Sequence, residues 1–540
     1  MGRPDGFHVY DTTLRDGAQR EGISYSVTDK LAVARLLDEY GVGFIEGGWP
    51  GALPKDTEFF ARARSELTLR HAELVAFGAT RKAGVRVDED PQVKALLDSQ
   101  APVITLVAKS DVRHVEQALR TTLDENESMV VDTVAYLVDQ GRRVFVDMEH
   151  FFDGYRHDRD YGVRLLVAAA QAGASVGVLC DTNGGMLPLG IAEVVSEVLA
   201  RTGVRIGIHC QDDTGCAVAN SVTAVQAGAT HVQCTANGYG ERTGNADLFV
   251  VVPNLQIKLG IDCLPDGALA ETTRIARELA EIANLAPDTH QPYAGWASFA
   301  HKAGLHASAL KVNADLYNHI DPSIVGNDQA ILVTEMAGRA SVELKGMELG
   351  YDLAEDPDLV TRVVNRVKEL EAQGWTFEAA DASFELLLLD ESGADWQFEV
   401  ESWRTIVEQR PDGTVASEAT VKVHAGGERI ISTAEGNGPV NALDRALRYA
   451  VRQIYPELMD LRLVDYKVRI LSSGEGTAAV TRVLVGTSNG RSDWSTVGVH
   501  ENVVAASWEA LQDAIRFGLV ESGRLRGPGA DSTTASSAPD

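Results

Sequence analysis

The feature that most constrains this chain is an alternation of short apolar runs with longer amphipathic stretches in its first half. Eight runs are rich in β-branched and aromatic residues, as strands are, and they lie at residues 7–11, 43–48, 73–79, 102–108, 143–149, 175–181, 204–209 and 230–236. Each run is followed by a segment with helical periodicity, such as TDKLAVARLLDEYG. Eight strand-then-helix units over about 250 residues predict a (β/α)8 TIM barrel, with a doubly wound open sheet as the alternative.

Length and charge limit the remaining possibilities. A chain of 540 residues exceeds one ordinary core, so we expect two or three domains. The net charge of −29 opposes binding to nucleic acid or to an anionic membrane surface. Apolar runs stay shorter than the ~18 residues that a membrane span needs. Five cysteines without CxxC spacing, and no signal-peptide pattern, predict reduced thiols and a cytoplasmic location.

A metal site is expected at the C-terminal ends of the barrel strands, where such barrels carry their chemistry. Asp16 follows the first predicted strand, His209 and Gln211 end the seventh, and Asn245 lies in the glycine-rich loop after the eighth. One carboxylate, one imidazole and two amide carbonyls leave two positions of an octahedron for an α-keto acid that chelates through two oxygens. Each residue alone is more simply a loop cap or a solvated polar group, but their convergence favours a site.

Three further side chains suit the chemistry of a keto acid. Arg15 could hold its cation at the keto oxygen, or form a structural salt bridge. Thr182 could bind the substrate carboxylate, or cap the helix that follows. The alternation along 143–149 puts Phe145, Asp147 and Glu149 on one side of the strand. Glu149 is therefore a candidate to orient or relay a proton, or else a partner of Arg15.

Four longer stretches carry a family resemblance: YDTTLRDGAQ, FIEGGWPG, HCQDDTGCAVAN and NGYGERTGN. They resemble the DRE-TIM metallolyases, in the branch of the α-isopropylmalate and homocitrate synthases, and the similarity runs from about residue 7 to 517. The resemblance implies a metal-dependent Claisen condensation, in which acetyl-CoA adds to an α-keto acid and thioester hydrolysis releases CoA. Within that branch, the stretches GWPGALPKD and FAHKAGLHASAL are most similar to the members that act on pyruvate. This resemblance implies pyruvate as the keto acid, citramalate as the product and a role in isoleucine synthesis.

The resemblance also implies roles for individual residues. Metal ligation falls on Asp16, His209 and Asn245, and the catalytic histidine on His306, held near Glu149. Trp49 could exclude larger keto acids, or pack in the core. The catalytic and substrate-binding positions expected in this way are Arg15, Gln19, Glu46, Trp49, Glu149, Thr182 and His306.

Gln211 is the main departure from the family pattern, which has a histidine there. Its carbonyl can still coordinate a metal, and we expect a divalent ion, with the hard ions Mg2+ or Mn2+ preferred and Zn2+ or Co2+ as the alternatives. Asp212, in place of the usual asparagine, could support the site. We expect a working enzyme because the other catalytic positions are filled. The alternatives are a sister synthase for another keto acid and a non-catalytic amino-acid sensor.

Beyond the barrel (1–275) we expect a helical linker at 276–375 and an α+β domain at 376–520. Two similar passes of strands followed by a helix predict a βββα repeat there, with a strand also at 383–389. The resemblance implies that the linker crosses to a partner barrel in a homodimer. The composition of 521–540 predicts a disordered tail.

The glycine-containing loops of this repeat are candidate effector contacts. The stretch GNGPVNAL places a proline at the start of a helix, whose N-terminus favours a carboxylate. The resemblance implies an allosteric domain with isoleucine as the feedback inhibitor. A dimerisation module that binds nothing is the alternative. The expected contacts are Gly436, Asn437, Gly438 and Gly498.

Overall fold

The structure of this chain is a computed structural model that describes residues 6–353, 355–394, 396, 398–471 and 479–524. It divides into two compact units, one formed by Met1–Phe299 with Ile320–Asp328 and the other by Ala300–His319 with Gln329–Asp540. The tail predicted to be disordered falls outside the described residues from 525 onward.

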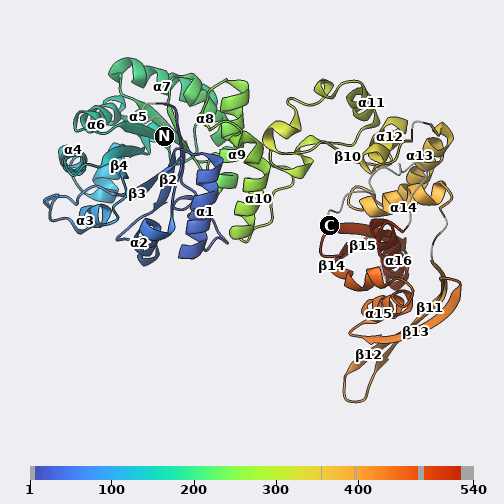
Figure 1. The fold of residues 1–540 in the computed structure, drawn as a ribbon. Helices are drawn as coiled ribbons and strands as arrows, with labels where there is room; N and C mark the ends of the chain where they lie inside the picture. Colours follow the sequence, from blue (N-terminus) through green and yellow to red (C-terminus); the bar gives the residue numbers. More distant parts are fainter. Residues whose placement is uncertain (1–5, 354, 395, 397, 472–478, 525–540) are drawn as a thin grey trace, which may run out of the picture. The chain divides into compact units, whose positions relative to one another are not determined.

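The first unit is a closed barrel of eight parallel strands, as predicted (Figure 1). Its strands are β1 (His8–Asp11), β2 (Phe44–Gly48), β3 (Glu73–Ala79), β4 (Val103–Lys109), β5 (Arg143–Glu149), β6 (Val176–Asp181), β7 (Ile206–Cys210) and β8 (His231–Cys234). The open-sheet alternative is excluded because β1 pairs with both β2 and β8.

Helices surround the strands and cover their outer face (Figure 1). They are α1 (Val27–Tyr40), α2 (Pro54–Glu66), α3 (Pro91–Asp98), α4 (Leu123–Asp139), α5 (Phe151–His157), α6 (Arg159–Gln171), α7 (Pro188–Thr202), α8 (Ala217–Gln226), α9 (Leu248–Pro253) and α10 (Thr272–Ile282). Both faces of each strand are therefore buried, which explains the nearly continuous apolar runs in the sequence.

Strand β5 shows how the alternation divides the side chains. Val144, Val146 and Met148 belong to the large core between strands and helices, whereas Phe145 belongs to the cluster inside the barrel. The predicted division of this strand is confirmed, and it directs Asp147 and Glu149 to the barrel mouth.

The N-terminal end of the barrel is filled by rings. Phe145 packs edge to face against both Phe44 and His231, and His8 packs edge to face against Phe44. The Nδ1 atoms of His8 and His231 lie 3.3 Å apart, and Arg143 contacts His8 Nε2 at 3.2 Å. Complete burial, reinforced by these neighbouring cationic and imidazole groups, lowers the pKa of His231 well below its ordinary value. This histidine is therefore a neutral core residue at neutral pH.

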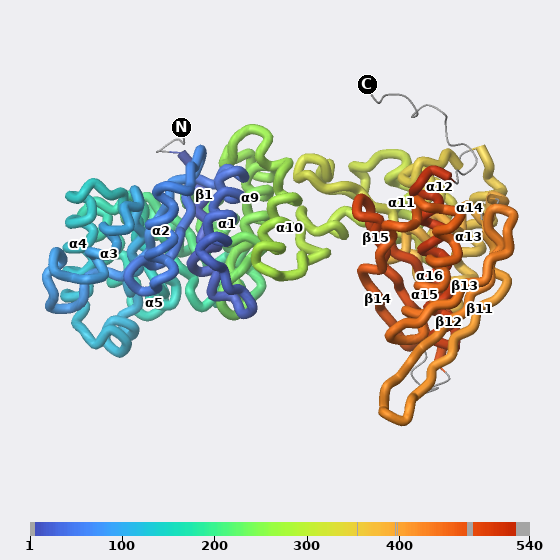
Figure 2. The backbone as a smooth tube through the Cα atoms, turned by 60° about the horizontal axis from the view of Figure 1, so that its bottom comes forward, coloured from blue at the N-terminus to red at the C-terminus, as the bar shows by residue number. Residues whose placement is uncertain are grey.

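The second unit begins with the strand pair β9 (Ala300–His301) and β10 (Ala330–Ile331) and a set of helices. These helices are α11 (Gly304–Val312), α12 (Arg339–Glu348), α13 (Pro357–Ala372) and α14 (Asp381–Glu391). Two three-stranded antiparallel sheets follow, β11–β12–β13 (Phe398–Gln409, Val415–Ala425, Glu428–Gly436) and β14–β15–β16 (Arg462–Ile470, Thr481–Ser488, Asp493–His500). Each packs against the helix after it, α15 (Pro439–Val451) or α16 (Val503–Glu521), which confirms the predicted βββα repeat (Figure 2).

The strand predicted at 383–389 is wrong, because these residues form α14. Leu386 contacts the core of the two sheets, while Phe384 and Leu388 contact the core of the preceding helices. A helix buried on nearly all sides has no polar face, so its apolar run lacks the helical period and looks like a strand.

The five cysteines are free thiols, as expected. Within the described ranges, no helix is both long and apolar enough to cross a membrane.

Candidate active site

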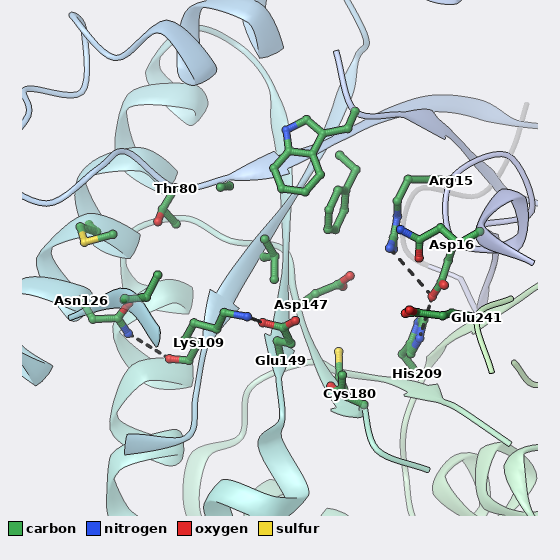
Figure 3. A pocket seen from close by; sticks show the side chains of 18 of the residues that line it. Arg15, Asp16, Thr80, Lys109, Asn126, Asp147, Glu149, Cys180, His209 and Glu241 are labelled. Carbon is green, nitrogen blue, oxygen red and sulfur yellow. Dashed lines mark hydrogen bonds and ion pairs between the residues drawn. The ribbon is translucent and has the colours of Figure 1, made fainter. Parts of the chain in front are cut away.

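A cavity of about 650 Å³ opens at the C-terminal ends of the barrel strands. Its lining brings together most of the predicted barrel residues, namely Arg15, Asp16, Gln19, Trp49, Glu149, Thr182, His209 and Gln211. Figure 3 shows the Asp16–His209 pair and the Lys109–Glu149 pair of this cavity, with Asp147 drawn between them. Gln19 is exposed at the rim, whereas the metal-ligand candidates are buried.

The predicted metal ligands converge. Asp16 Oδ2 lies 3.3 Å from His209 Nε2, and Gln211 Nε2 lies 3.2 Å from the same Asp16 oxygen. Burial opposes ionisation of Asp16, but the hydrogen bond from His209 and the charge of Arg15 outweigh it and lower the pKa to about 2. Asp16 is therefore a carboxylate at neutral pH, in a position that suits a cation.

Two amide oxygens beside this pair lack a partner within the described ranges. Gln211 Oε1 and Asn245 Oδ1 are both buried, and neither accepts a hydrogen bond from a described residue. The backbones of Gln211 and Asn245 form a bridge that holds the two side chains together, and Asn245 Nδ2 donates to the carbonyl of Tyr239 at 3.0 Å. Unpaired buried carbonyl oxygens are costly, so these atoms, with Asp16 and His209, fit an oxygen-preferring divalent cation.

The set does not resemble a zinc site. In the part of the chain that the structure describes, no three His, Cys, Asp or Glu side chains are grouped so that they could hold a metal ion by themselves. Gln211 donates to Asp16 through Nε2, so a cation there would repel that group and favour a turned amide that presents Oε1. Asp212, which was expected to support the site, instead accepts a hydrogen bond from the Ala217 backbone at 2.7 Å at the start of α8.

Arg15 is held by a buried carboxylate. Its Nε donates to Glu46 Oε1 at 2.5 Å, its guanidinium lies 3.9 Å from the centre of the Phe77 ring, and Thr12 Oγ1 donates to the same Glu46 oxygen at 2.6 Å. Arg15 thus forms the salt bridge considered as its alternative role and also lines the cavity. Glu46 is fully buried behind Arg15 rather than exposed to the cavity.

Glu149 is paired with Lys109, the residue beside it in the register of β4 and β5. The alternative role considered for Glu149, as a partner of Arg15, is wrong, because Arg15 pairs with Glu46 and Glu149 pairs with Lys109. Both side chains are about one quarter exposed and line the cavity. Lys109 neutralises the carboxylate and leaves it accessible to a ligand.

Sequence reasoning gave no role to Asp147 or to Gln233. Asp147 lines the cavity, and burial together with the charge of Glu46 raises its pKa to about 7. Gln233 Nε2 donates to Asp147 Oδ1 at 2.8 Å, and Gln233 Oε1 lies 2.7 Å from His209 Nδ1. The strand alternation that placed Asp147 inward was the available signal, and the same alternation places Gln233 inward with His231.

Thr182 does not cap the helix that follows it, because its hydroxyl accepts from a different backbone group. Its Oγ1 accepts a hydrogen bond from the His150 backbone at 2.8 Å, while α7 begins only at Pro188 with Leu187 as its N-cap. The Thr182 hydroxyl lines the cavity and retains its own hydrogen to donate.

Arg242 joins three loops at the cavity mouth. It donates two hydrogen bonds to Asp213, at 2.8 and 2.9 Å, and a third to the carbonyl of Thr182 at 2.8 Å. These residues follow β8, β7 and β6, so one side chain fixes the relative positions of three loops of the site.

Trp49 forms part of the cavity wall and also packs on a neighbour. Its Nε1 donates to Gln92 at 2.8 Å, and its ring meets Phe77 edge to face at 5.2 Å. Both roles considered for it are therefore compatible with its position.

His306 belongs to the other compact unit, in α11, where its ring stacks on Tyr317 with centroids 4.2 Å apart. Its pairing with Glu149 therefore stays a prediction. In the repeat, a Cβ at Gly436 would lie 2.5 Å from Ala442 N, and one at Gly498 would lie 2.0 Å from Ala506 O. Close helix packing is thus one reason for these two glycines, whereas a Cβ at Gly438 would meet no described atom within 4 Å.

Comparison with known proteins agrees with this architecture. The HMGL-like family model matches residues 7–284, the homocitrate synthase post-HMGL domain-like model 294–374, and the LeuA allosteric (dimerisation) domain model 378–519. The fold and the site define an HMGL-like barrel protein, and the chain belongs to that family, in the predicted DRE-TIM branch.

Curated relatives narrow the position within the family. The (R)-citramalate synthase of Streptomyces coelicolor is 67% identical, over 96% of this chain and 98% of that protein. The (R)-citramalate synthase of Synechocystis is 49% identical, over 95% and 96%. A probable 2-isopropylmalate synthase of Methanopyrus kandleri is 33% identical, over 94% and 97%.

Proposed function

We propose that this protein is an (R)-citramalate synthase, an acyltransferase that condenses acetyl-CoA with pyruvate and hydrolyses the thioester to give citramalate and CoA. Identity of 67% over nearly the whole length to a protein of that name supports the assignment. The observation that carries the mechanism is the group formed by Asp16, His209 and the unpaired amide oxygens of Gln211 and Asn245.

These four residues would hold a divalent ion, with Mg2+ or Mn2+ preferred over Zn2+ or Co2+ because oxygen ligands predominate. When bound, the ion supplies Lewis-acid polarisation of the keto group.

Arg15 stabilises the negative charge that develops on the keto oxygen during carbon–carbon bond formation. Its bond to Glu46 leaves the remaining guanidinium N–H groups to face the cavity, and the Phe77 ring limits its rotation. Fixed donors of this kind need no reorganisation when the charge appears, which is why they are effective. Thr182 donates its hydroxyl hydrogen to the substrate carboxylate.

Proton transfer falls to Glu149 and His306. The acetyl methyl group loses a proton, and its enolate carbon bonds to the keto carbon of pyruvate. The alkoxide that forms takes up a proton, and water then cleaves the thioester. A base must be positioned because thioester methyl protons are weakly acidic. A crossing of the linker to a partner barrel would bring His306 to the site, and the LeuA dimerisation domain match supports a homodimer.

The test is release of CoA, followed with a thiol reagent. Acetyl-CoA and Mg2+ or Mn2+ are supplied with pyruvate, 2-oxoisovalerate, 2-oxobutyrate or 2-oxoglutarate in separate reactions. We expect release with pyruvate, abolished by a chelator and restored by added metal. Release with another keto acid instead would assign a sister synthase. No release of CoA with any substrate or metal would favour an amino-acid sensor in which Gln211 abolishes metal binding.

The C-terminal repeat is proposed to bind isoleucine as a feedback inhibitor, through Gly436, Asn437, Gly438 and Gly498. The match to the LeuA allosteric domain supports a regulatory role. Gly438 is the N-cap of α15, where a ligand carboxylate would meet backbone N–H groups.

The charge at position 438 tests this effector site. Gly438→Asp keeps a good N-cap but repels a carboxylate, so we expect its inhibition by isoleucine to weaken at least ~tenfold. Gly438→Ala, which adds neither a charge nor a capping acceptor, is the matched control and should retain inhibition. Equal inhibition of both variants would place the effector elsewhere.

Five free cysteines suit a reducing compartment, and we propose a cytoplasmic location.

A further inference from the structure

The main chain of Trp49 is fixed by a carboxylate behind the cavity wall. Trp49 follows β2, and its backbone N–H donates to Asp56 Oδ2 of α2 at 2.8 Å. Its indole Nε1 donates to Gln92 Oε1 of α3 at 2.8 Å, and Gln92 Nε2 donates to the Pro50 carbonyl at 3.2 Å. Both the backbone and the ring of Trp49 are therefore held by side chains from the outer helices.

Asp56 is itself held by a buried cation. Lys30 of α1 pairs with Asp56 Oδ1 and donates a second hydrogen bond to the Gly47 carbonyl at 3.0 Å. The side chains of Lys30 and Asp56 are each only 4% exposed. The ion pair therefore binds both peptide groups that flank Gly48, the Gly47 carbonyl on one side and the Trp49 N–H on the other.

Gly48 shows how closely the carboxylate approaches this turn. Its φ is 138°, a conformation that residues other than glycine rarely adopt. A Cβ added there would lie 2.4 Å from Asp56 Cγ, so the carboxylate occupies the space that a side chain would need. A displacement of Asp56 therefore moves the backbone that carries Trp49.

Stability alone does not explain this ion pair. The cost of removing two charges from water offsets much of their attraction, so an apolar pair of similar volume is often at least as stable. Neither Lys30 nor Asp56 lines the cavity, so neither contacts a substrate there. What the ion pair provides is a fixed geometry for the turn after β2.

This geometry matters because Trp49 adjoins the position proposed for the keto acid. Its ring meets Phe77 edge to face at 5.2 Å, and the centre of the Phe77 ring lies 3.9 Å from the Arg15 guanidinium. Trp49, Phe77 and Arg15 all line the cavity. Since Arg15 is proposed to face the keto oxygen, the wall formed by Trp49 and Phe77 limits the space for the rest of the keto acid.

We propose that Lys30 and Asp56 are positioning residues for substrate selection, which fix the main chain of Trp49 so that the cavity wall excludes keto acids larger than pyruvate. This inference rests on the proposed function for the identity of the substrates. The position of Trp49 is a property of the free protein and can be measured without substrate.

The first experiment compares kcat/KM for pyruvate with kcat/KM for 2-oxobutyrate, which is longer by one methylene. Lys30→Met with Asp56→Leu, the apolar variant, replaces the ion pair and removes the acceptor of the Trp49 N–H. One methylene in an apolar pocket is worth about 10- to 200-fold in discrimination, so we expect the ratio of the two kcat/KM values to fall about tenfold. Trp49→Ala should lower the same ratio at least as far.

The matched control is Lys30→Met with Asp56→Asn, the amide variant. It also removes both charges, but it keeps an oxygen that accepts from the Trp49 N–H, so it should retain most of the wild-type ratio. A purely structural role would lower kcat/KM for both keto acids by a common factor and leave the ratio unchanged. An unchanged ratio in the apolar variant, or equal falls in the apolar and amide variants, would overturn the proposal.

Asp56→Glu tests the same contact in a protein that keeps the ion pair. The added methylene pushes the carboxylate against the turn at Gly48, so we expect a ratio between those of the wild type and the apolar variant. This variant decides the question even where the apolar pair is not tolerated in the fold. Wild-type selectivity in Asp56→Glu would contradict the proposal.

The second experiment follows Trp49 by nitrogen NMR of the full-length protein with 15N-labelled tryptophan and no substrate. Its backbone and indole signals are assigned by their loss in Trp49→Phe. We expect both signals to move in the apolar variant, and the indole signal to return toward its wild-type position in the amide variant. Wild-type signals in the apolar variant would refute the positioning role. Absence of CoA release by the wild type with every keto acid would instead refute the proposed function, and the NMR result would still decide how Trp49 is positioned.

Discussion

Each end of the barrel contains a buried histidine, and the pKa of the two histidines is shifted in opposite directions. His231 starts β8 at the closed end, and His209 lies one layer higher on the neighbouring strand, where it pairs in register with Gln233. His231 faces His8 and aromatic rings, and its pKa is lowered by burial and by nearby positive groups. His209 is equally enclosed, yet Asp16 outweighs burial and raises its pKa.

The difference shows that burial alone does not mark a functional histidine. At the closed end the ring serves as packing, and its polar contact is to His8, which in turn contacts Arg143. At the mouth, an anion and two unpaired amide oxygens surround the ring. An excess of acceptors over donors therefore distinguishes the site from the core.

Asp16→Ala has the largest expected effect. It removes the anionic member of the proposed ligand set, so we expect CoA release to fall at least ~1,000-fold, because Lewis-acid stabilisation is worth several kcal/mol. The matched change at the closed end, His231→Phe, should leave kcat/KM near the wild-type value. Comparable losses in both variants would remove the functional distinction between the two ends.

Glu46→Ala should give the next largest effect, on stability. It leaves the buried Arg15 cation without its carboxylate, which costs about 3–5 kcal/mol in the free energy of unfolding. Urea denaturation measures this loss, and Glu46→Gln, which keeps an accepting oxygen, should lose less. A loss below about 1 kcal/mol would mean that the pair behaves as an exposed ion pair.

Gln211→His tests the metal selectivity of the site at the barrel mouth. A second imidazole should raise the affinity for Zn2+ or Co2+ relative to Mg2+ by about tenfold, near 1.4 kcal/mol. Competition titrations of the metal-free protein provide the measurement, with Asp212→Asn as the control because Asp212 bonds to the α8 backbone. An unchanged ratio of affinities would show that residue 211 does not coordinate the ion.

The smallest expected effect concerns acid stability at the closed end. Because the pKa of His231 is lower in the folded state than in the unfolded chain, the unfolded state binds the extra proton first, and stability is lost as pH falls below about 6.5. In His231→Phe this loss should be smaller by up to ~1.4 kcal/mol per pH unit. Urea midpoints at pH 7.5 and 5.5 test this, with the exposed His290→Gln as control. An equal acid loss in the wild type and His231→Phe would contradict it.

The barrel was predictable from sequence because strands buried on both faces leave apolar runs that turns and helices interrupt. The positions of Asp16 and His209 followed from the rule that barrel chemistry lies after the strands. The pairing of Glu149 with Lys109 could not be predicted from the sequence, because it depends on the register of β4 against β5. Gln233 was missed for the same reason, since its partners come from β5 and β7. The buried α14 was mistaken for a strand because uniform burial removes the helical period.

The loops tied together by Arg242 affect how the protein meets its ligands. Fixing a residue's backbone costs about 1–2 kcal/mol of conformational entropy. Arg242 orders the segments after β6, β7 and β8 when the protein folds. The entropy cost of ordering these loops is therefore not incurred again when a ligand binds. The loops at the barrel mouth therefore form a rigid binding site before the ligand arrives, and a larger share of the contact energy contributes to binding affinity.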